Sequence, residues 1–162
     1  MKENIYTKIE KVVVNSGIGR LSQQAGFTDK LLPEIEREFS AITGQRGAVK
    51  SARISIAGFK IREGNIVGIM VTLRGKRMEY FMKKVINIVL PRVRDFRGVD
   101  PKAVDRSGNL TIGLKEHLVF PEVSPETSKV NFGLQITVVP KVQKLAPSLA
   151  LYKELGVPFK KK

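Results

Sequence analysis

Apolar and polar residues alternate along three stretches of the chain, and this alternation is typical of β-strands with one buried face. The stretches are residues 65–74, 110–115 and 132–139. Residues 8–15, KIEKVVVN, are rich in β-branched side chains and predict a further strand. In the alternating stretches the Val, Ile and Leu side chains share one face, so we expect these faces to form part of a core.

A helical period covers residues 28–43, where apolar side chains recur at every third or fourth position. Thr28 or Asp29 is expected to cap the start of this helix, and Gly44 is expected to end it. The helix also carries three alternating carboxylates, which do not all point to one side, and we expect them to be solvated. They are Glu34, Glu36 and Glu38.

A second helix is predicted over residues 76–90, with an apolar stripe on one side and a lysine-rich opposite side. Pro91 is expected to stop it, because a proline disfavours helical backbone in the residue before it. A short last helix is expected at residues 147–155. The long stretch at residues 92–109 is rich in Arg, Asp and Gly and is expected to be a loop.

Strands and helices are mixed without strict alternation, so the expected class is α+β, with a largely antiparallel sheet in a single domain of residues 1–162. The helices are expected to cover the Val, Ile and Leu face of the sheet. The other face then carries small polar residues and Arg. Antiparallel sheets often leave one face in water, and a flat polar face also admits a nucleic-acid backbone; the residues favour neither interpretation.

The amount and the position of the basic charge give separate evidence about the surface of this chain. The chain carries 29 Lys and Arg against 15 Asp and Glu, a net charge of +14. Residues 50–97 alone hold 12 basic and three acidic residues, a net charge of +9. Such clustering is typical of a surface that binds a polyanion. The alternative is a basic surface that serves only solubility.

Composition excludes several classes. There are no cysteines, which excludes disulfides, thiolate catalysis and cysteine-ligated zinc and fits a reducing cytosol. The start MKENIYTK lacks the apolar segment of a signal peptide, and no run approaches the roughly 18 apolar residues of a membrane span. We therefore expect a cytoplasmic protein that has no membrane partner.

The sequence offers little support for a catalytic site or a metal site. His117 is the only histidine, so it is a poor metal ligand or triad member, and we expect a structural role for it. Residues 17–20, GIGR, lack the spacing of a nucleotide-binding loop and are interpreted as a tight turn. With no nucleophile–base pair, the sequence predicts no catalytic residue, no metal site, no cofactor and no enzyme.

Two basic segments are candidate phosphate-binding sites. VTLRGKR places Arg74, Lys76 and Arg77 at a strand-to-helix corner, where backbone N–H groups of the helix also point; the alternative is a solvated corner. LPRVRDFRG brings further arginines into an expected functional loop, although nearby Asp95 and Asp100 offer local neutralisation instead. These arginines are Arg92, Arg94 and Arg97.

The segment AGFKIREGN sets an aromatic residue in a basic, glycine-flanked loop. Phe59 stands next to Lys60, with Arg62 three positions after Phe59, and the residues alone assign no role to the aromatic ring.

Six segments in this order and spacing resemble the bacterial-type family of large-subunit ribosomal protein five, the 5S-rRNA binder. They are KIEKVVVNSGIG, ITGQ, AGFKIREG, VTLRG, LPRVRDFRG and FPE. The similarity covers about residues 8–140, and the C-terminal helix and the ending VPFKKK resemble the family more loosely. Members usually carry a helical segment before the first strand, whereas seven residues precede Lys8 here. We expect contacts made by that segment to be absent or replaced.

The resemblance implies a structural ribosomal protein whose exposed sheet face and nearby loops bind 5S rRNA. It implies that Asn15 and Gln45 bind 5S rRNA together with Thr72 and Arg74. The strand alternation independently assigns Thr72 and Arg74 to the polar face. The loop at residues 57–64 is then expected to contact P-site tRNA through Gly58, Phe59, Lys60, Ile61 and Arg62. In this loop Phe59 is expected either to pack into the core at the base of the loop or to stack on RNA, while Lys60 and Arg62 meet phosphates. Residues 116–129 are expected to meet a small-subunit head protein, protein thirteen.

The further partners that the resemblance implies are 23S rRNA and other proteins of the central protuberance. A generic RNA-binding or RNA-chaperone module acting off the ribosome is the alternative, because the residues alone predict RNA binding and not its setting.

Overall fold

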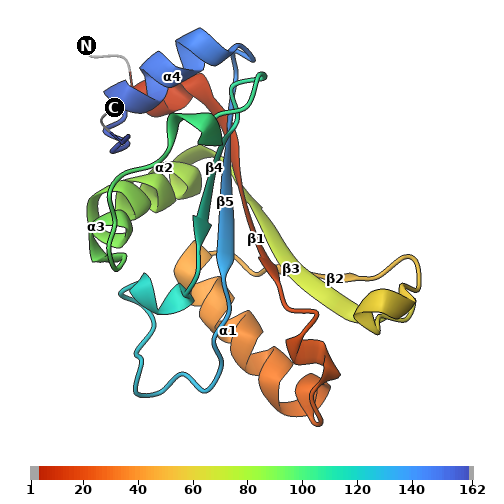
Figure 1. Ribbon diagram of the computed structural model, residues 1–162. Coiled ribbons are helices and arrows are strands. Elements are labelled where there is room, and N and C mark those ends of the chain that lie inside the picture. The colour runs from red at the N-terminus through yellow and green to blue at the C-terminus, as the bar shows by residue number, and fades with distance from the viewer. Residues whose placement is uncertain (1–3, 161–162) are drawn as a thin grey trace. The chain divides into compact units, whose positions relative to one another are not determined.

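The computed structural model describes residues 4–160 and contains a five-stranded antiparallel sheet. Its strand order is β2-β3-β1-β5-β4, and Figure 1 shows the strands with their labels. The expected α+β class is confirmed. The strands are β1 (Ile9–Gly17), β2 (Ala48–Ser51), β3 (Ile66–Leu73), β4 (Leu110–Leu114) and β5 (Leu134–Pro140).

The chain divides into two compact units, and the division falls within strands that continue from one unit to the other. The first unit comprises the described residues of Met1–Val13, Thr72–Leu114 and Gln135–Lys162. The second unit comprises Val14–Val71 and Lys115–Leu134. A single domain over residues 1–162 stays a prediction.

The strand alternation read from the sequence is confirmed. In β3 the side chains of Ile69, Val71 and Leu73 are buried, whereas Thr72 between the last two is half-buried. The same alternation holds in β4 and β5, where every second side chain is buried. The strand β2 was missed, because its four residues AVKS have no apolar alternation.

The first helical segment covers nearly the expected residues, but it begins without a side-chain cap. A π-helical turn (Phe27–Leu31) precedes α1 (Leu32–Thr43), and the chain enters this turn through Gly26 at a φ of 74°. The expected cap by Thr28 or Asp29 is therefore wrong: the left-handed glycine replaces it. Gly44 ends the helix as expected, at a φ of 72°, and its N–H donates to the Ser40 carbonyl.

Within the second unit, α1 packs against β3 at a glycine. A Cβ atom on Gly47 would lie 2.6 Å from Ile69 Cγ1 and 2.8 Å from Phe39 Cδ1. Phe39 and Ile69 are both buried. No larger residue fits at Gly47 without shifting this part of the core, because real Cβ atoms do not approach other atoms so closely.

The second helical segment continues past the proline that was expected to stop it. It consists of α2 (Gly75–Lys84), a π-helical turn (Val85–Val89) and α3 (Leu90–Arg92). Pro91 lies inside α3, and Val93 is the first residue with extended backbone. Pro91 has no N–H group and cannot donate the usual helical hydrogen bond. The π-helical turn before it shifts the hydrogen-bonding pattern of the backbone at this point, so the helix does not end there.

The remaining helix α4 (Leu145–Glu154) belongs to the first unit and begins two residues earlier than expected. Its Tyr152 is fully buried, and the hydroxyl donates to the Gly108 carbonyl oxygen at 2.7 Å, with the Val138 carbonyl oxygen at 3.2 Å. Within residues 4–160, every helix is too short or too polar to cross a bilayer. Short 3-10 turns cover Ile5–Lys8, Leu21–Gln23, Ala57–Phe59, Pro101–Ala103 and His117–Val119.

Candidate nucleic-acid interface

The strand-to-helix corner of the first unit exposes its cations. Arg74 has extended backbone at the N-cap of α2, and its side chain makes no capping hydrogen bond. Gly75 follows at a φ of 61°, a left-handed conformation that glycine adopts without strain. Lys76 and Arg77 are exposed on the first turn of the helix. Cationic side chains and free helix N–H groups therefore meet at this corner, an arrangement that favours phosphate.

An acidic side chain one turn further along α2 is already compensated. Glu79 accepts a hydrogen bond from Lys83 at 2.6 Å and another from Asn4 at 3.1 Å. These two bonds, that from Lys83 above all, lower the pKa of Glu79, and the same contact with Glu79 raises the pKa of Lys83. Glu79 and Lys83 thus neutralise each other and leave the charge of Arg74 uncompensated by them.

The four polar residues implied by the resemblance fall on two units. Thr72 and Arg74 belong to the first unit, with Thr72 half-buried and Arg74 exposed. Asn15 and Gln45 belong to the second unit and are both half-buried. The Gln45 carbonyl accepts a hydrogen bond from the Thr43 hydroxyl at 2.8 Å. That the four side chains form one surface stays a prediction.

The loop at residues 52–65 is an ordered hairpin rather than irregular chain. Ile56 and Ile61 exchange two backbone hydrogen bonds, of 2.8 and 3.1 Å. Lys60 adopts a left-handed conformation with a φ of 53°, which turns the chain between them. Ala52 pairs with the other end of the loop through Asn65 and Gly64. Figure 1 shows this loop at the end of the β2–β3 ribbon.

The hairpin presents apolar side chains to solvent. Phe59 is 70% exposed, so the interpretation of Phe59 as a core residue is wrong. Ile54 is 72% exposed and Ile56 nearly half exposed. Neither isoleucine was predicted to be exposed, although two isoleucines outside the predicted strands and helices were the available signal. The side chain of Gln23 donates to the Phe59 carbonyl at 3.0 Å and ties the hairpin tip to the Leu21–Gln23 turn.

The arginine-rich loop of the first unit is also exposed at all three cations. Asp100 lies in the same segment, and its carboxylate accepts the backbone N–H of Lys102 at 2.9 Å. Asp95 takes a left-handed conformation with a φ of 55°. Within residues 4–160, no ion pair joins either aspartate to these arginines, which are Arg92, Arg94 and Arg97.

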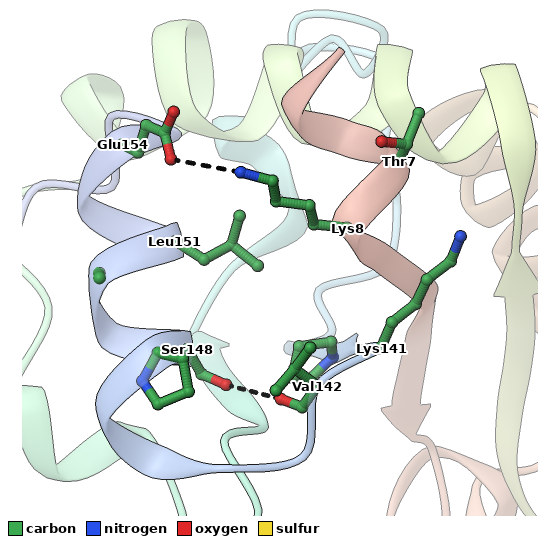
Figure 2. A pocket seen from close by; sticks show the side chains of 10 residues that line it. Thr7, Lys8, Lys141, Val142, Ser148, Leu151 and Glu154 are labelled. Atoms are coloured by element: carbon green, nitrogen blue, oxygen red, sulfur yellow. Dashed lines mark hydrogen bonds and ion pairs between the residues drawn. The ribbon is translucent and has the colours of Figure 1, made fainter. Parts of the chain in front are cut away.

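A separate hollow of the first unit, of about 520 Å³, lies between α4, the 3-10 turn at Ile5–Lys8 and the segment after β5. Figure 2 shows Lys8 reaching across it to Glu154, with 3.9 Å between Nζ and Oε2. The Ser148 hydroxyl donates to the Val142 carbonyl at its other side. None of the predicted site residues lines this hollow.

Comparison with known proteins identifies the family of this chain. The family model described as "Ribosomal protein L5" matches residues 6–62, and a second model, which describes the C-terminus of the same family, matches residues 66–159. The chain belongs to the ribosomal protein L5 family. The resemblance seen in the six sequence segments is thereby confirmed. The L5 family is a family of ribosomal proteins, so the expectation that the chain is not an enzyme is confirmed as well.

Curated relatives of the L5 family align over nearly the whole chain. A protein named large ribosomal subunit protein uL5c, from Paulinella chromatophora, is 44% identical over 153 residues, which are 94% of this chain and 83% of the relative. The proteins named large ribosomal subunit protein uL5 from Acaryochloris marina and Halothermothrix orenii are 46% and 43% identical. The alignments cover 94% and 97% of this chain and 82% and 87% of those relatives.

His117 of this L5 family member is part of a buried polar cluster in the second unit. The ring is fully buried and stacks on Phe132, with 3.9 Å between ring centroids. The Phe132 N–H donates to Nδ1, so Nε2 carries the proton and donates to Glu38 Oε2 at 2.8 Å. The Ser128 hydroxyl lies 3.1 Å from the same oxygen. The cluster agrees with a structural role for His117.

The expectation of solvated glutamates on α1 is therefore wrong for Glu38, which is buried. Glu34 is also engaged, because it accepts the backbone N–H of Lys129 at 3.1 Å. Both carboxylates hold the segment at residues 116–129, and sequence spacing gave no signal for this pairing. Within residues 4–160, no group of three or more potential metal-binding side chains comes together.

Proposed function

We propose that this chain is a structural constituent of the large ribosomal subunit that binds 5S rRNA and helps attach it to the central protuberance. Membership of the ribosomal protein L5 family carries the ribosomal part of the proposal. The exposed corner at Arg74 and Lys76, with the free N-terminus of α2, supports the RNA-binding part, because phosphates favour such a site. The expected location is the ribosome in the cytoplasm.

The 5S rRNA surface that we propose combines phosphate contacts with contacts to bases and 2′-hydroxyls. Arginine and lysine at the corner neutralise phosphates, whereas amide and hydroxyl groups bond to base edges and riboses. The proposed residues are Asn15, Gln45, Thr72, Arg74, Lys76 and Arg77. Contacts with 23S rRNA and with other proteins of the central protuberance complete this proposal.

The second part of the proposal assigns the hairpin at residues 52–65 to P-site tRNA. Its exposed Phe59 offers a flat apolar face for a base or ribose, and the neighbouring Lys60 and Arg62 offer charges for phosphates. The backbone bonds between Ile56 and Ile61 hold the tip in one shape before a partner arrives, which lowers the entropic cost of binding.

The third part of the proposal assigns residues 116–129 to the small-subunit head protein thirteen. Glu34 and Glu38 fix this segment to α1, so its conformation is set in the free protein. A segment held in this way keeps one shape for a protein partner.

The test of the proposed function compares RNAs of equal length. Purified protein is titrated with 5S rRNA and with an unrelated RNA of the same length in the same buffer, and we expect clearly tighter binding to 5S rRNA. Co-sedimentation with the 50S subunit after a high-salt wash is the second measurement. Equal affinity for both RNAs together with loss of the protein from washed subunits would support the alternative, a generic RNA-binding module acting off the ribosome.

A further inference from the structure

The C-terminal segment of the chain pairs with the arginine-rich loop of the first unit. The Val99 N–H donates to the Pro158 carbonyl at 2.7 Å, and the Lys160 N–H donates to the Val99 carbonyl at 2.9 Å. Val99 and Phe159 thereby form a parallel bridge. Residues 157–160 thus run alongside the end of the loop at residues 93–99, and the backbone of each is fixed by the other.

Gly98 allows this close approach. Its φ is 103°, a conformation that L-residues with a side chain rarely adopt. A Cβ atom there would lie 2.8 Å from the Lys160 nitrogen and 2.9 Å from the Phe159 carbonyl carbon. Both partners of that approach are backbone atoms, which cannot rotate away. A residue other than glycine at position 98 therefore displaces the C-terminal segment.

The C-terminal segment is itself anchored to the helix before it. The Val157 N–H donates to the Tyr152 carbonyl at 3.0 Å, and Val157 is buried. Tyr152 is held in turn by its buried hydroxyl. The loop is therefore fastened, through residues 157–160, to an element with a buried side chain rather than to a free chain end.

Four exposed cations lie along this paired structure. Arg94 and Arg97 lie in the loop, the third cation is the last residue of α3, and the fourth is Lys160, whose backbone lies against Gly98. Within residues 4–160 no ion pair joins Asp95 or Asp100 to these arginines, and three arginines against two aspartates leave residues 92–100 with a net charge of +1, to which Lys160 adds. Guanidinium groups bind phosphate through two parallel hydrogen bonds, so three arginines in six positions suit a row of phosphates. The cations are Arg92, Arg94, Arg97 and Lys160.

We propose that these four cations form one binding surface for the sugar–phosphate backbone of RNA, and that the C-terminal segment positions it. We call this the loop–tail surface. Its RNA partner rests on the proposed ribosomal role, but the interaction itself is with phosphate and does not depend on the RNA sequence. An acidic protein is the weaker fit, because protein interfaces need a buried apolar anchor and the loop's only aromatic residue, Phe96, is already half-buried.

The first experiment removes the charges without touching the backbone pairing. The full chain carrying Arg92→Gln, Arg94→Gln and Arg97→Gln is titrated with a mixed-sequence RNA duplex over a range of salt concentrations. The matched control, Lys141→Gln, Lys144→Gln and Lys153→Gln, removes the same charge from exposed positions elsewhere in the first unit. A mixed-sequence duplex is used so that the result does not depend on 5S rRNA recognition.

We expect the loop variant to bind the duplex at least about tenfold more weakly. We also expect it to lower the slope of log affinity against log salt by about 2–3, because each phosphate that is no longer neutralised lowers the slope by about 1. The control variant is expected to lose much less affinity. Equal losses in the two variants would show a general charge effect and overturn the proposal. So would a wild-type protein that does not bind the duplex, or one that binds an acidic peptide equally well through the same arginines.

The second experiment tests the positioning role of the C-terminal segment. Gly98→Ala is compared with Gly113→Ala, since position 113 lies on β4 of the same unit and has open space for a Cβ atom. We expect Gly98→Ala to speed hydrogen exchange at the Val99 and Lys160 amides and to weaken duplex binding severalfold, while Gly113→Ala changes neither. Faster exchange with unchanged affinity would overturn the positioning role. Loss of 5S rRNA preference with duplex binding intact would instead count against the proposed function alone.

Discussion

Glu38 and His117 lie 79 positions apart in the chain, and their side chains meet in the interior of the second unit with 2.8 Å between Oε2 and Nε2. Both are buried, and Ser128 shares the same carboxylate oxygen. A buried carboxylate is tolerated only when donors satisfy it, so His117 and Ser128 together stabilise the position of Glu38. The hydrogen bond joins α1 to the segment at residues 116–129.

The first prediction concerns this hydrogen bond. His117→Leu leaves the carboxylate of Glu38 buried with Ser128 as its remaining donor, and we expect the free energy of unfolding to fall by about 1.5–3 kcal/mol, because a hydrogen bond to a charged group is lost. Urea unfolding of the purified chain measures it. Adding Glu38→Leu to the variant is expected to recover part of the loss, because no unpaired charge then remains.

The control for that prediction is Glu36→Gln on the same helix. Glu36 pairs with Arg46 at 3.6 Å, but the Arg46 side chain is largely exposed. We expect a loss below about 1 kcal/mol, since solvent screens such a pair. Similar losses for Glu36→Gln and His117→Leu would contradict the role assigned to the buried cluster.

The second prediction concerns the proposed 5S rRNA surface. Thr72→Ala and Arg74→Ala are expected to weaken 5S rRNA binding, by about 1.5–3 kcal/mol where a hydrogen bond to a charged phosphate is removed. The melting temperature of Arg74→Ala should change little, because substitutions at exposed polar positions usually alter stability by no more than about 0.5 kcal/mol. Thr72 is half-buried, so the affinity of Thr72→Ala is read together with its own melting temperature. The two measurements are binding affinity and thermal unfolding of each variant.

Thr7→Ala and Arg106→Ala are the matched controls for that pair. Thr7 is exposed in the 3-10 turn at Ile5–Lys8, and Arg106 is exposed in the same unit. Neither belongs to the proposed surface, so wild-type affinity is expected. Wild-type affinity in both Thr72→Ala and Arg74→Ala would contradict the proposed 5S rRNA surface.

The third prediction concerns the hairpin. Because Phe59 is largely exposed, replacing Phe59, Lys60 and Arg62 with Ala is expected to alter the free energy of unfolding by no more than about 0.5 kcal/mol per residue. Binding of 5S rRNA should stay near wild type. Occupancy of the P-site by tRNA, measured on ribosomes that carry the variant, should fall.

Phe39→Ala provides the contrast for the hairpin variant. Phe39 is fully buried, and its truncation is expected to cost about 3–5 kcal/mol of stability. If the hairpin variant loses stability on that scale, Phe59 supports the fold and its exposure does not serve a partner. Unchanged tRNA occupancy would count against the tRNA contact.

The fourth prediction is a pH dependence at Tyr152. Burial raises the pKa of this phenol above its ordinary value of 10.0. The phenol therefore stays protonated in the folded chain at pH values where the unfolded chain loses the proton. Its contribution is fully present below pH 10 and is lost as the pH rises above that value.

Tyr152→Phe removes the hydroxyl that donates to the Gly108 carbonyl, and we expect it to lower stability by about 1–3 kcal/mol at about pH 8. The gap between wild type and variant should shrink at about pH 11, as measured by urea unfolding. Tyr80→Phe, at an exposed position of α2, is the control and should match wild type at the lower pH. A gap of the same size at both pH values would refute the prediction.

The fifth prediction concerns the clustered charge. If residues 50–97 contact RNA, affinity for 5S rRNA should fall by orders of magnitude between about 50 and 200 mM salt. Lys50→Gln with Arg53→Gln should lower the salt slope by about 1 for each phosphate that these side chains neutralise in the wild type. Lys30→Gln with Arg37→Gln removes two exposed charges outside this segment and should leave the slope nearly unchanged. A flat salt response would contradict the proposed footprint.

Several elements of the fold followed from local patterns. The alternation at residues 65–74 predicted which side chains of β3 are buried, because successive side chains of a strand point to opposite faces. Gly44 marked the end of α1, since a helix commonly ends in a left-handed residue. The exposed cations at Arg74 and Lys76 followed from their position after a strand and before an amphipathic helix.

Other features depended on neighbours distant in the chain. Pro91 was expected to end a helix, but a π-helical turn ahead of it lets the helix continue to Arg92. The strand β2 forms because its backbone bonds to β3, and its own sequence carries no pattern. Local propensity is a weak guide where tertiary pairing supplies the hydrogen bonds.

The sequence by itself determined the α+β class, the faces of the strands, the basic character and the family of this protein, because these depend on local periodicity, composition and motif order. Only the tertiary structure decided that Glu38 is buried against His117, that Phe59 is exposed, and that residues 157–160 fix the arginine-rich loop. These three features depend on which groups, distant in the sequence, exclude water from a side chain or satisfy its hydrogen bonds. The spacing of residues along the chain does not predict such contacts.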